Sequence, residues 1–349
     1  MARKKKMLPK DFEDLLKAGD VAALKAVFAT CERDARGGVF KQTALAFSEC
    51  PDDLSRWLVA EGADIGAGDS YGETPLHSRA RHWRGGLDVL IELGADVNAG
   101  EGGRGTPLHN AAGSGHVDNA RVLLAHGAHV DALDRSGHTP LEHALIRCSN
   151  AEIAQRAKLA DLLLQAGAAK TDRAAEAITR IGTNFEFHRA GFNPDYLEET
   201  DAGLQRLYAL FGVPPVPRRA LHDGRAPIVA TAARWEDRHQ ELWELLVPSS
   251  GAAETVQGEV IRLSGRIARE LDGNGGVNWD AQYRRMTDTW LAHVGSGKPL
   301  PAADLAEATA LAAAIRKRAG EPGRMCELAV AWVALNPRPV KLTPPDYDR

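Results

Sequence analysis

Residues 72–77 read Gly-Glu-Thr-Pro-Leu-His, and this motif recurs twice in the first half of the chain. It returns as Gly105-Thr106-Pro107-Leu108-His109 and as Gly137-His138-Thr139-Pro140-Leu141-Glu142. The three threonines follow one another at intervals of 32 and 33 residues. Self-similarity at a fixed period of this length is the signature of repeat proteins, in which each unit buries its apolar face against its neighbours.

A second marker runs in phase with the first. Each copy pairs a glycine with an alanine after an apolar pair or triplet, and the copies are Gly62-Ala63, Gly94-Ala95, Gly127-Ala128 and Gly167-Ala168. A glycine directly after a helix ends it in a left-handed conformation that other residues enter only at a cost. The Thr-Pro of the first marker starts a helix, because threonine caps the free amides and proline fits the first helical position.

Across residues 38–170 the sequence resembles the ankyrin repeat, on the strength of these two markers. The resemblance implies an all-α fold for this region, a solenoid of helix pairs joined by β-hairpin loops. It also implies that His77 and His109 hydrogen-bond to the backbone between adjacent repeats. One repeat cannot bury its own apolar face, so the stack is the folding unit.

The repeats at the two ends of the array depart from this pattern. Residues 8–37 contain two short apolar segments broken by Gly19-Asp20, and we interpret them as a divergent first repeat or N-terminal cap. The last repeat has Glu142 where the family has histidine, and about seven extra residues around 149–152 lengthen the connection between its two helices. Capping of the stack explains most of these departures, because terminal repeats are commonly atypical.

The second half of the chain loses the period, and its apolar residues recur at helical spacing instead. We therefore predict an α-helical C-terminal domain of five to seven helices over residues 171–335, with a Pro-rich bend near 213–219. Five of its residues are tryptophans on apolar stripes, where we expect them to form the core: Trp235, Trp243, Trp279, Trp290 and Trp332. We identify no family resemblance in this half. The remaining parts are a repeat array with its cap over 11–170, a basic tail at 1–10 and an extended Pro-rich tail at 336–349.

Composition narrows the classes of function. Lys and Arg number 43 and Asp and Glu 47, which gives a net charge of −4 among 349 residues. A protein that binds phosphate backbones is typically basic, so the composition does not favour a nucleic-acid partner. The usage of Ala, Arg and Gly indicates a bacterial source with a GC-rich genome.

Cysteines and apolar segments bear on the compartment. The four cysteines lie far apart without a C-x-x-C pair, which excludes a zinc ribbon and a disulfide scaffold: Cys31, Cys50, Cys148 and Cys326. The basic N-terminus is not followed by the apolar region of a signal peptide. No stretch reaches the length of apolar residues that a membrane span needs. We therefore expect a soluble protein of a reducing cytoplasm.

Catalytic motifs are weak throughout the sequence. Residues 68–72 match Gly-x-Ser-x-Gly, but they fall in a repeat hairpin and lack the preceding strand that a nucleophile elbow requires. Gly273-Asn274-Gly275-Gly276 follows a helical stripe and is typical of a helix end rather than a phosphate loop. The polar residues around His239 are expected to form a solvated helix face. We therefore expect no catalytic residue, no cofactor and no metal ligand in this chain.

Candidate binding residues follow from the resemblance to ankyrin repeats. In that family, partner contacts come from the hairpin tips and from inner-helix positions on the concave face. Carried over by position, the tip residues are Tyr71, Glu73, Arg104, Arg135 and His138. The positions at the inner helices are Arg81, His82, Trp83, Ile146 and Arg147. Tyrosine, tryptophan and arginine are the residue types that carry most binding energy at protein interfaces.

A structural role remains open for part of this set. Arg79, Arg81 and Arg84 could instead form a solvated helix end, and Trp83 could pack onto the next repeat. The sequence leaves three functions open as well. The first is a protein-binding adaptor or inhibitor of bacterial type, including an immunity or antitoxin protein. The second is an effector or enzyme whose repeats recruit substrate to the helical domain, and the third is an oligomeric scaffold.

Overall fold

The structure is a computed structural model that describes residues 3–347, so the outermost residues of both expected tails, 1–2 and 348–349, lie outside the described residues. It is mostly helical and divides into two compact units. The first unit runs to Phe185 and resumes over Asn193–Val216. The second comprises Glu186–Phe192 and the chain from Pro217 onward. The all-α fold class expected from the sequence is confirmed.

The first unit begins with a small sheet and two helices. Its first elements are β1 (Lys5–Met7), α1 (Phe12–Ala18), α2 (Val21–Thr30), β2 (Cys31–Gly37) and β3 (Gln42–Thr43). The two helices and the break between them agree with the sequence analysis. Gly19 is left-handed with φ 71°, and the Asp20 carboxylate accepts hydrogen bonds from the first free amides of α2.

The three strands were not predicted. They pair in the order β1-β2-β3, with β1 parallel and β3 antiparallel to β2. In β2 only Cys31 and Ala35 are fully buried, and the residues between them are polar and half-exposed. A half-buried strand is recognised in a sequence by apolar residues that alternate with polar ones. Two buried residues four positions apart do not produce that alternation.

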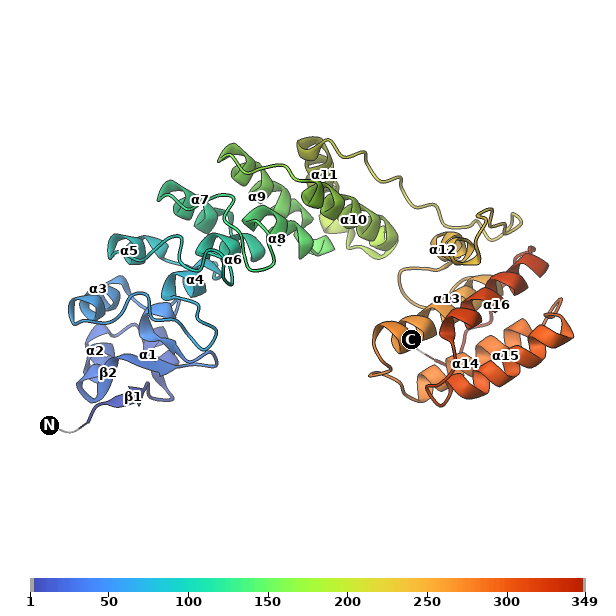
Figure 1. Cartoon of the computed structure of the whole chain (residues 1–349), viewed down its shortest axis with the longest axis horizontal. Coiled ribbons are helices and arrows are strands. Elements are labelled where there is room, and N and C mark those ends of the chain that lie inside the picture. The colour runs from blue at the N-terminus through green and yellow to red at the C-terminus, as the bar shows by residue number, and fades with distance from the viewer. Residues whose placement is uncertain (1–2, 348–349) are drawn as a thin grey trace. The chain divides into compact units, whose positions relative to one another are not determined.

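The repeat helices follow one another in chain order along a curved row (Figure 1). They are η1 (Ala44–Ala46), α3 (Asp52–Ala60), α4 (Pro75–Ala80), α5 (Leu87–Glu92), α6 (Pro107–Gly113), α7 (Val117–Ala125), α8 (Pro140–Ile146), η2 (Asn150–Glu152) and α9 (Ile153–Gln165). The inner helices α4, α6 and α8 lie on the concave side of the row. Each of them begins at the proline of the first marker, directly after its capping threonine. The glycines of the second marker are all left-handed, as predicted: Gly62, Gly94, Gly127 and Gly167.

The motif histidines connect adjacent repeats. The Nδ1 atom of His77 accepts a hydrogen bond from the Thr74 amide at 3.2 Å, so its Nε2 donates to the Gly105 carbonyl at 3.0 Å. His109 repeats this arrangement with Thr106 and with the His138 carbonyl, also at 3.0 Å. Burial lowers the pKa of both imidazoles. Both rings therefore serve as neutral connectors between repeats, as the resemblance implied.

Glu142 replaces the histidine in the last repeat because the element that follows is different. Its carboxylate accepts the Thr139 amide at 3.0 Å, which completes a capping box. The same carboxylate accepts the Thr171 hydroxyl at 2.6 Å and the Arg173 guanidinium at 3.3 Å. In place of the hairpin carbonyl that accepts from a motif histidine, the next segment offers hydrogen-bond donors. A carboxylate, which only accepts hydrogen bonds, can pair with these donors.

Two long helices continue the first unit beyond the repeats, namely α10 (Asp172–His188) and α11 (Pro194–Phe211). The helix α11 packs closely on α9, because a Cβ atom at Gly203 would lie 2.7 Å from the Cα of Ala154. The end of the repeat period predicts a domain boundary at residue 170. The structure groups residues 171–185 and 193–216 with the repeats instead.

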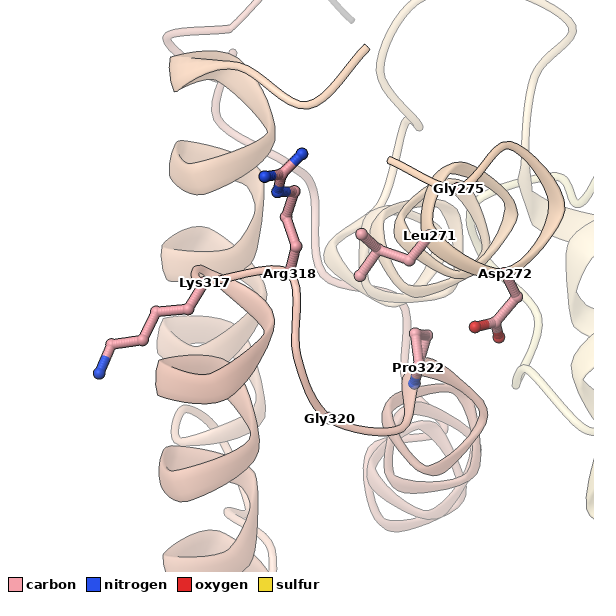
Figure 2. A pocket seen from close by; sticks show the side chains of 7 residues that line it. All are labelled: Leu271, Asp272, Gly275, Lys317, Arg318, Gly320 and Pro322. Atoms are coloured by element: carbon pink, nitrogen blue, oxygen red, sulfur yellow. The ribbon is translucent and has the colours of Figure 1, made fainter. Parts of the chain in front are cut away.

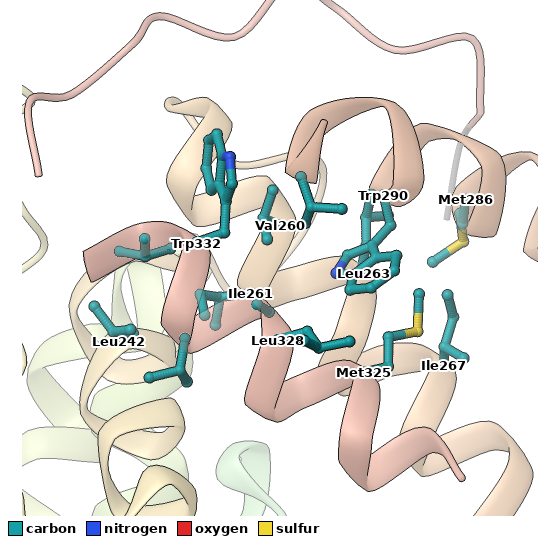
Figure 3. Packing of buried hydrophobic residues seen from close by; sticks show 14 of the residues in the cluster. Leu242, Val260, Ile261, Leu263, Ile267, Met286, Trp290, Met325, Leu328 and Trp332 are labelled. Atoms are coloured by element: carbon teal, nitrogen blue, oxygen red, sulfur yellow. The ribbon is translucent and has the colours of Figure 1, made fainter. Parts of the chain in front are cut away.

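The second unit is a bundle of five helices within the described residues. They are α12 (Trp235–Leu246), α13 (Val256–Ala268), α14 (Ala281–Val294), α15 (Ala302–Ile315) and α16 (Pro322–Leu335). The helix α13 lies at the centre, since Val260, Ile261, Leu263 and Ile267 are all fully buried against its neighbours (Figure 3). These helices agree with the apolar stripes of the sequence.

The tryptophans of this unit divide into two groups. Trp290 and Trp332 are fully buried in the core, as Figure 3 shows. Trp243 and Trp279 are half-buried and pack against its edge, and Trp235 is also half-buried. The expected core role thus holds fully for two of the five residues.

The C-terminal segment is tied to the second unit rather than free. We call residues 336–347 the strap. The Gln257 side chain donates to the carbonyls of Asn336 and Arg338 at 2.8 and 2.7 Å, and it accepts the Val340 amide at 3.0 Å. The Tyr347 ring is buried, and its hydroxyl donates to Glu259 at 2.6 Å. The segment is extended, as the sequence predicted, but it covers the bundle.

Candidate binding surface

The hairpin tips of successive repeats are joined to one another through their backbones. The Ser70 amide donates to the Phe40 carbonyl at 2.9 Å, and the Gly102 amide donates to the Leu133 carbonyl at 2.8 Å. The Arg135 amide donates to the Gly103 carbonyl at 2.5 Å. These bonds join the first tip to the second and the third tip to the fourth.

Exposed aromatic and aliphatic side chains follow these tips. The ring of Tyr71 lies 6.0 Å from that of Phe40 and 5.2 Å from the guanidinium of Arg104, so the second tip touches both of its neighbours. Val39 on the first tip and Leu133 on the fourth are exposed as well. We call these five residues the tip ridge. The exposed fractions of its apolar members are 91% for Val39, 44% for Phe40, 51% for Tyr71 and 49% for Leu133.

Three residues of the tip ridge were missed in the sequence analysis: Val39, Phe40 and Leu133. Each of them is an apolar residue inside or beside a turn that is marked by glycine and charged residues. This position could have indicated an exposed side chain, but an apolar residue is usually assigned to the core. Tyr71 and Arg104 were expected from their positions, and the structure brings their side chains together.

Trp83 is also an exposed aromatic residue of the repeats, and 67% of its surface is accessible. It stacks with His82 and lies 4.4 Å from the Arg84 guanidinium. The Asn119 amide from α7 donates to the carbonyls of Ala80 and His82 at 3.0 and 2.8 Å, which fixes the turn that carries the tryptophan. Packing of Trp83 onto the next repeat, the alternative from the sequence, is inconsistent with this exposure.

The three arginines near α4 have different environments. Arg79 is fully buried and donates to the carbonyls of Leu45 and Gly86 at 2.9 and 3.0 Å, so it fastens the repeat and is no part of a solvated helix end. Arg81 makes two bonds to the Glu73 carboxylate, at 2.5 and 2.7 Å. Arg84 is exposed beside Trp83.

The remaining candidates lie further along the array. Arg135 and Arg147 are exposed. Ile146 is half-buried at the end of α8, and His138 is half-buried in its hairpin, where its carbonyl accepts from His109. The structure thus brings together the pairs Tyr71 with Arg104, Glu73 with Arg81 and His82 with Trp83.

Two aspartates build the hairpins that carry these residues. Asp69 accepts the amides of Tyr71 and Glu73 at 2.7 and 3.0 Å. Asp134 accepts the amides of Ser136 and His138 at 2.8 and 3.0 Å. Burial opposes the ionised form of Asp134, but these two amides together with the His143 and His138 side chains lower the pKa of the carboxyl. Both carboxylates are therefore engaged in holding the tips.

The pair closest to a catalytic arrangement lies in the second unit. The His239 Nε2 atom is 3.0 Å from the hydroxyl oxygen of Ser264. That hydroxyl is fully buried and donates to the Ile261 carbonyl at 3.0 Å, so it is not an accessible nucleophile. Burial lowers the pKa of His239 to about 4. The expected solvated face was wrong for this histidine, which packs against α13.

Other chemical features of the described residues are structural. Burial raises the pKa of the Cys326 thiol to about 12, so this thiol is protonated and unreactive at neutral pH. Within residues 3–347 no three His, Cys, Asp or Glu side chains form a group that could hold a metal ion. The same residues include no helix with the length and apolar character needed to cross a membrane.

A cavity of about 340 Å³ in the second unit lies between the end of α13 and the turn before α16. Lys317, Arg318 and Asp272 line it together with glycines and Pro322. Figure 2 shows that these three charged side chains point in different directions. A catalytic pocket needs polar groups that converge on one point. This cavity therefore does not support the hypothesis of a catalytic helical domain.

Comparison with known families supports the repeat assignment. Residues 90–144, from the end of α5 to α8, match the model for ankyrin repeats in many copies. No curated protein matches the chain. The matched region contains the second and third copies of the Thr-Pro-Leu motif and the histidine connector His109. Residues 90–144 therefore consist of ankyrin repeats, and the recurrence of both markers around them supports the same repeat across the array.

Proposed function

We propose that this protein is an adaptor or inhibitor that binds one other protein through the concave side of its repeat array. Ankyrin repeats are protein–protein interaction modules without catalytic activity of their own. We further propose that the protein acts in a bacterial cytoplasm, and this part rests only on its composition and on the spacing of its cysteines. The observation that carries it is the exposure of Tyr71 and Trp83 on repeats whose other large apolar side chains are mostly buried.

The chemistry of these two residues supports a binding role. A tryptophan and a tyrosine offer large contact areas at a small cost in side-chain entropy, and both are enriched among residues that dominate binding energy. Each has an arginine against its ring, Arg84 on Trp83 and Arg104 on Tyr71. Arginine is the third residue type enriched at such positions.

A double variant tests the proposal. Tyr71→Ala with Trp83→Ala should weaken binding of the purified partner by about 2 kcal/mol or more, roughly thirtyfold. The free energy of unfolding should change by less than about 0.5 kcal/mol for each substitution, because both side chains are largely exposed. Calorimetric titration of the partner and denaturant unfolding of the variant measure the two quantities.

The matched control is Tyr196→Ala, which removes a tyrosine that is 60% exposed on α11. The control should leave affinity unchanged. If the double variant also binds with unchanged affinity, the partner does not use these repeats, and the search moves to the helical bundle.

A further inference from the structure

We propose that the tip ridge binds an acidic, extended segment of the partner that carries apolar side chains. This inference rests on the proposed function and adds the chemistry of the partner to it. Three properties support it: the ridge exposes apolar side chains on three of four adjacent tips, the arginines on and beside it lack carboxylate partners, and its members follow one another from tip to tip.

The aromatic side chains of the first two tips are in contact with each other rather than isolated, since the rings of Phe40 and Tyr71 lie 6.0 Å apart. The backbone bond between Gly102 and Leu133 joins the tip that carries Leu133 to the third tip. Single exposed apolar residues are normal on a protein surface, whereas contiguous ones mark interaction sites. Apolar side chains of a partner are the groups that gain from covering this surface.

Arginines on and beside the ridge are not neutralised. Among residues 3–347, no carboxylate lies within ion-pair distance of the Arg104 or the Arg135 guanidinium. The Arg104 guanidinium lies over the face of Tyr71, and stacking on a ring leaves the N–H donors in the guanidinium plane available. Both side chains are exposed at their tips.

Carboxylates near the ridge, in contrast, are already engaged. Asp69 and Asp134 each accept two backbone amides, and Glu73 pairs with Arg81. Glu101 lies 2.8 Å from the His129 imidazole. The guanidinium groups of Arg104 and Arg135 therefore remain available to carboxylates of a partner, although the whole chain has a net charge of −4. Complementary charge selects partners and speeds their association, so a negatively charged partner fits this face.

The geometry favours an extended segment over a single small ligand. Contacts connect the first tip to the second through Phe40 and Tyr71, and the second to the third through Tyr71 and Arg104. A partner that covers Phe40, Arg104 and Leu133 together must span four tips. Aliphatic Val39 and Leu133 at the two ends favour a peptide over single-stranded nucleic acid, whose bases stack on aromatic side chains.

Peptide binding to the full chain tests the inference. The probe is a fluorescent peptide in which Glu alternates with Phe and Leu, and its counterpart has Gln in place of Glu. The acidic peptide should bind more tightly than the Gln peptide. Its affinity should fall as the salt concentration is raised, because salt screens exposed charges. The double variant Arg104→Glu with Arg135→Glu should reduce its affinity about tenfold or more.

The control variant is Arg121→Glu, which reverses an exposed arginine on the outer helix α7 and should leave peptide affinity unchanged. Equal affinity for the two peptides, no binding of the acidic peptide, or no effect of the Arg104/Arg135 variant would overturn the inference. Binding of oligouridylate in preference to the peptide would overturn it as well. If the natural partner loses affinity for the Tyr71/Trp83 variant but not for the Arg104/Arg135 variant, the proposed function stands and this inference fails.

Discussion

Replacing Glu259 with Ala is expected to lower the free energy of unfolding of the second unit by about 3–5 kcal/mol. Glu259 is fully buried and pairs with Arg262, whose guanidinium donates to it at 2.8 and 2.6 Å. Tyr347 and the Ala253 amide donate to the same carboxylate. Burial opposes its ionisation, but these donors lower the pKa of Glu259, so it is charged at neutral pH. Its removal takes away the carboxylate that lies 2.6 and 2.8 Å from the buried Arg262 guanidinium.

Denaturant unfolding of the full chain, followed by tryptophan fluorescence, measures this loss. The variant Glu259→Gln keeps the shape of the side chain and removes its charge, so it should also destabilise the unit. The control Glu254→Ala changes an exposed carboxylate nearby and should alter the free energy of unfolding by less than about 0.5 kcal/mol. A loss below about 1 kcal/mol for Glu259→Ala would show that the ion pair does not hold the strap and the bundle together.

A fragment that ends at residue 169 is expected to be several kcal/mol less stable than one that ends at residue 216. The shorter fragment lacks α10 and α11, so it exposes the face of α9 around the buried Ile153. Each fully buried Ile or Leu that becomes exposed costs about 1.5–3 kcal/mol. Glu142 also loses the donors Thr171 and Arg173.

Urea unfolding of the two fragments, followed by circular dichroism, compares them directly. We propose a boundary near residue 216, because α11 packs on α9 and closes the stack. Equal stability of the two fragments would contradict this proposal. It would favour the boundary near residue 170 that the end of the repeat period indicated.

The parts of the fold that the sequence predicted depend on local signals. A Thr-Pro cap and a left-handed glycine act within one helix turn, so the repeat helices could be placed from the sequence alone. The helical stripes of the second half are local in the same sense. The place of α11 could not be predicted, because it depends on the close approach of Gly203 to Ala154 some fifty residues earlier.

Long-range polar contacts were equally invisible in the sequence. The strap is held by Gln257 and Glu259, which lie far from it along the chain. Tyr71 and Arg104 were chosen by position in the repeat, and their contact followed from the stacking of the tips. The local sequence does not distinguish Arg79 from an exposed arginine. Its burial is explained by the carbonyls of Leu45 and Gly86, which lie far from it in the sequence or in the following turn and accept its hydrogen bonds.

Hydrogen exchange of the full chain, with and without its bound partner, tests the central claim most directly. If the partner binds the concave side and the tips, amides at 69–73, 81–86 and 100–105 should exchange more slowly in the complex. Amides on the outer helix α7 and in the second unit should then exchange at unchanged rates. Protection confined to residues 217–347, with the repeats unaffected, would contradict the account and place the binding site in the helical bundle.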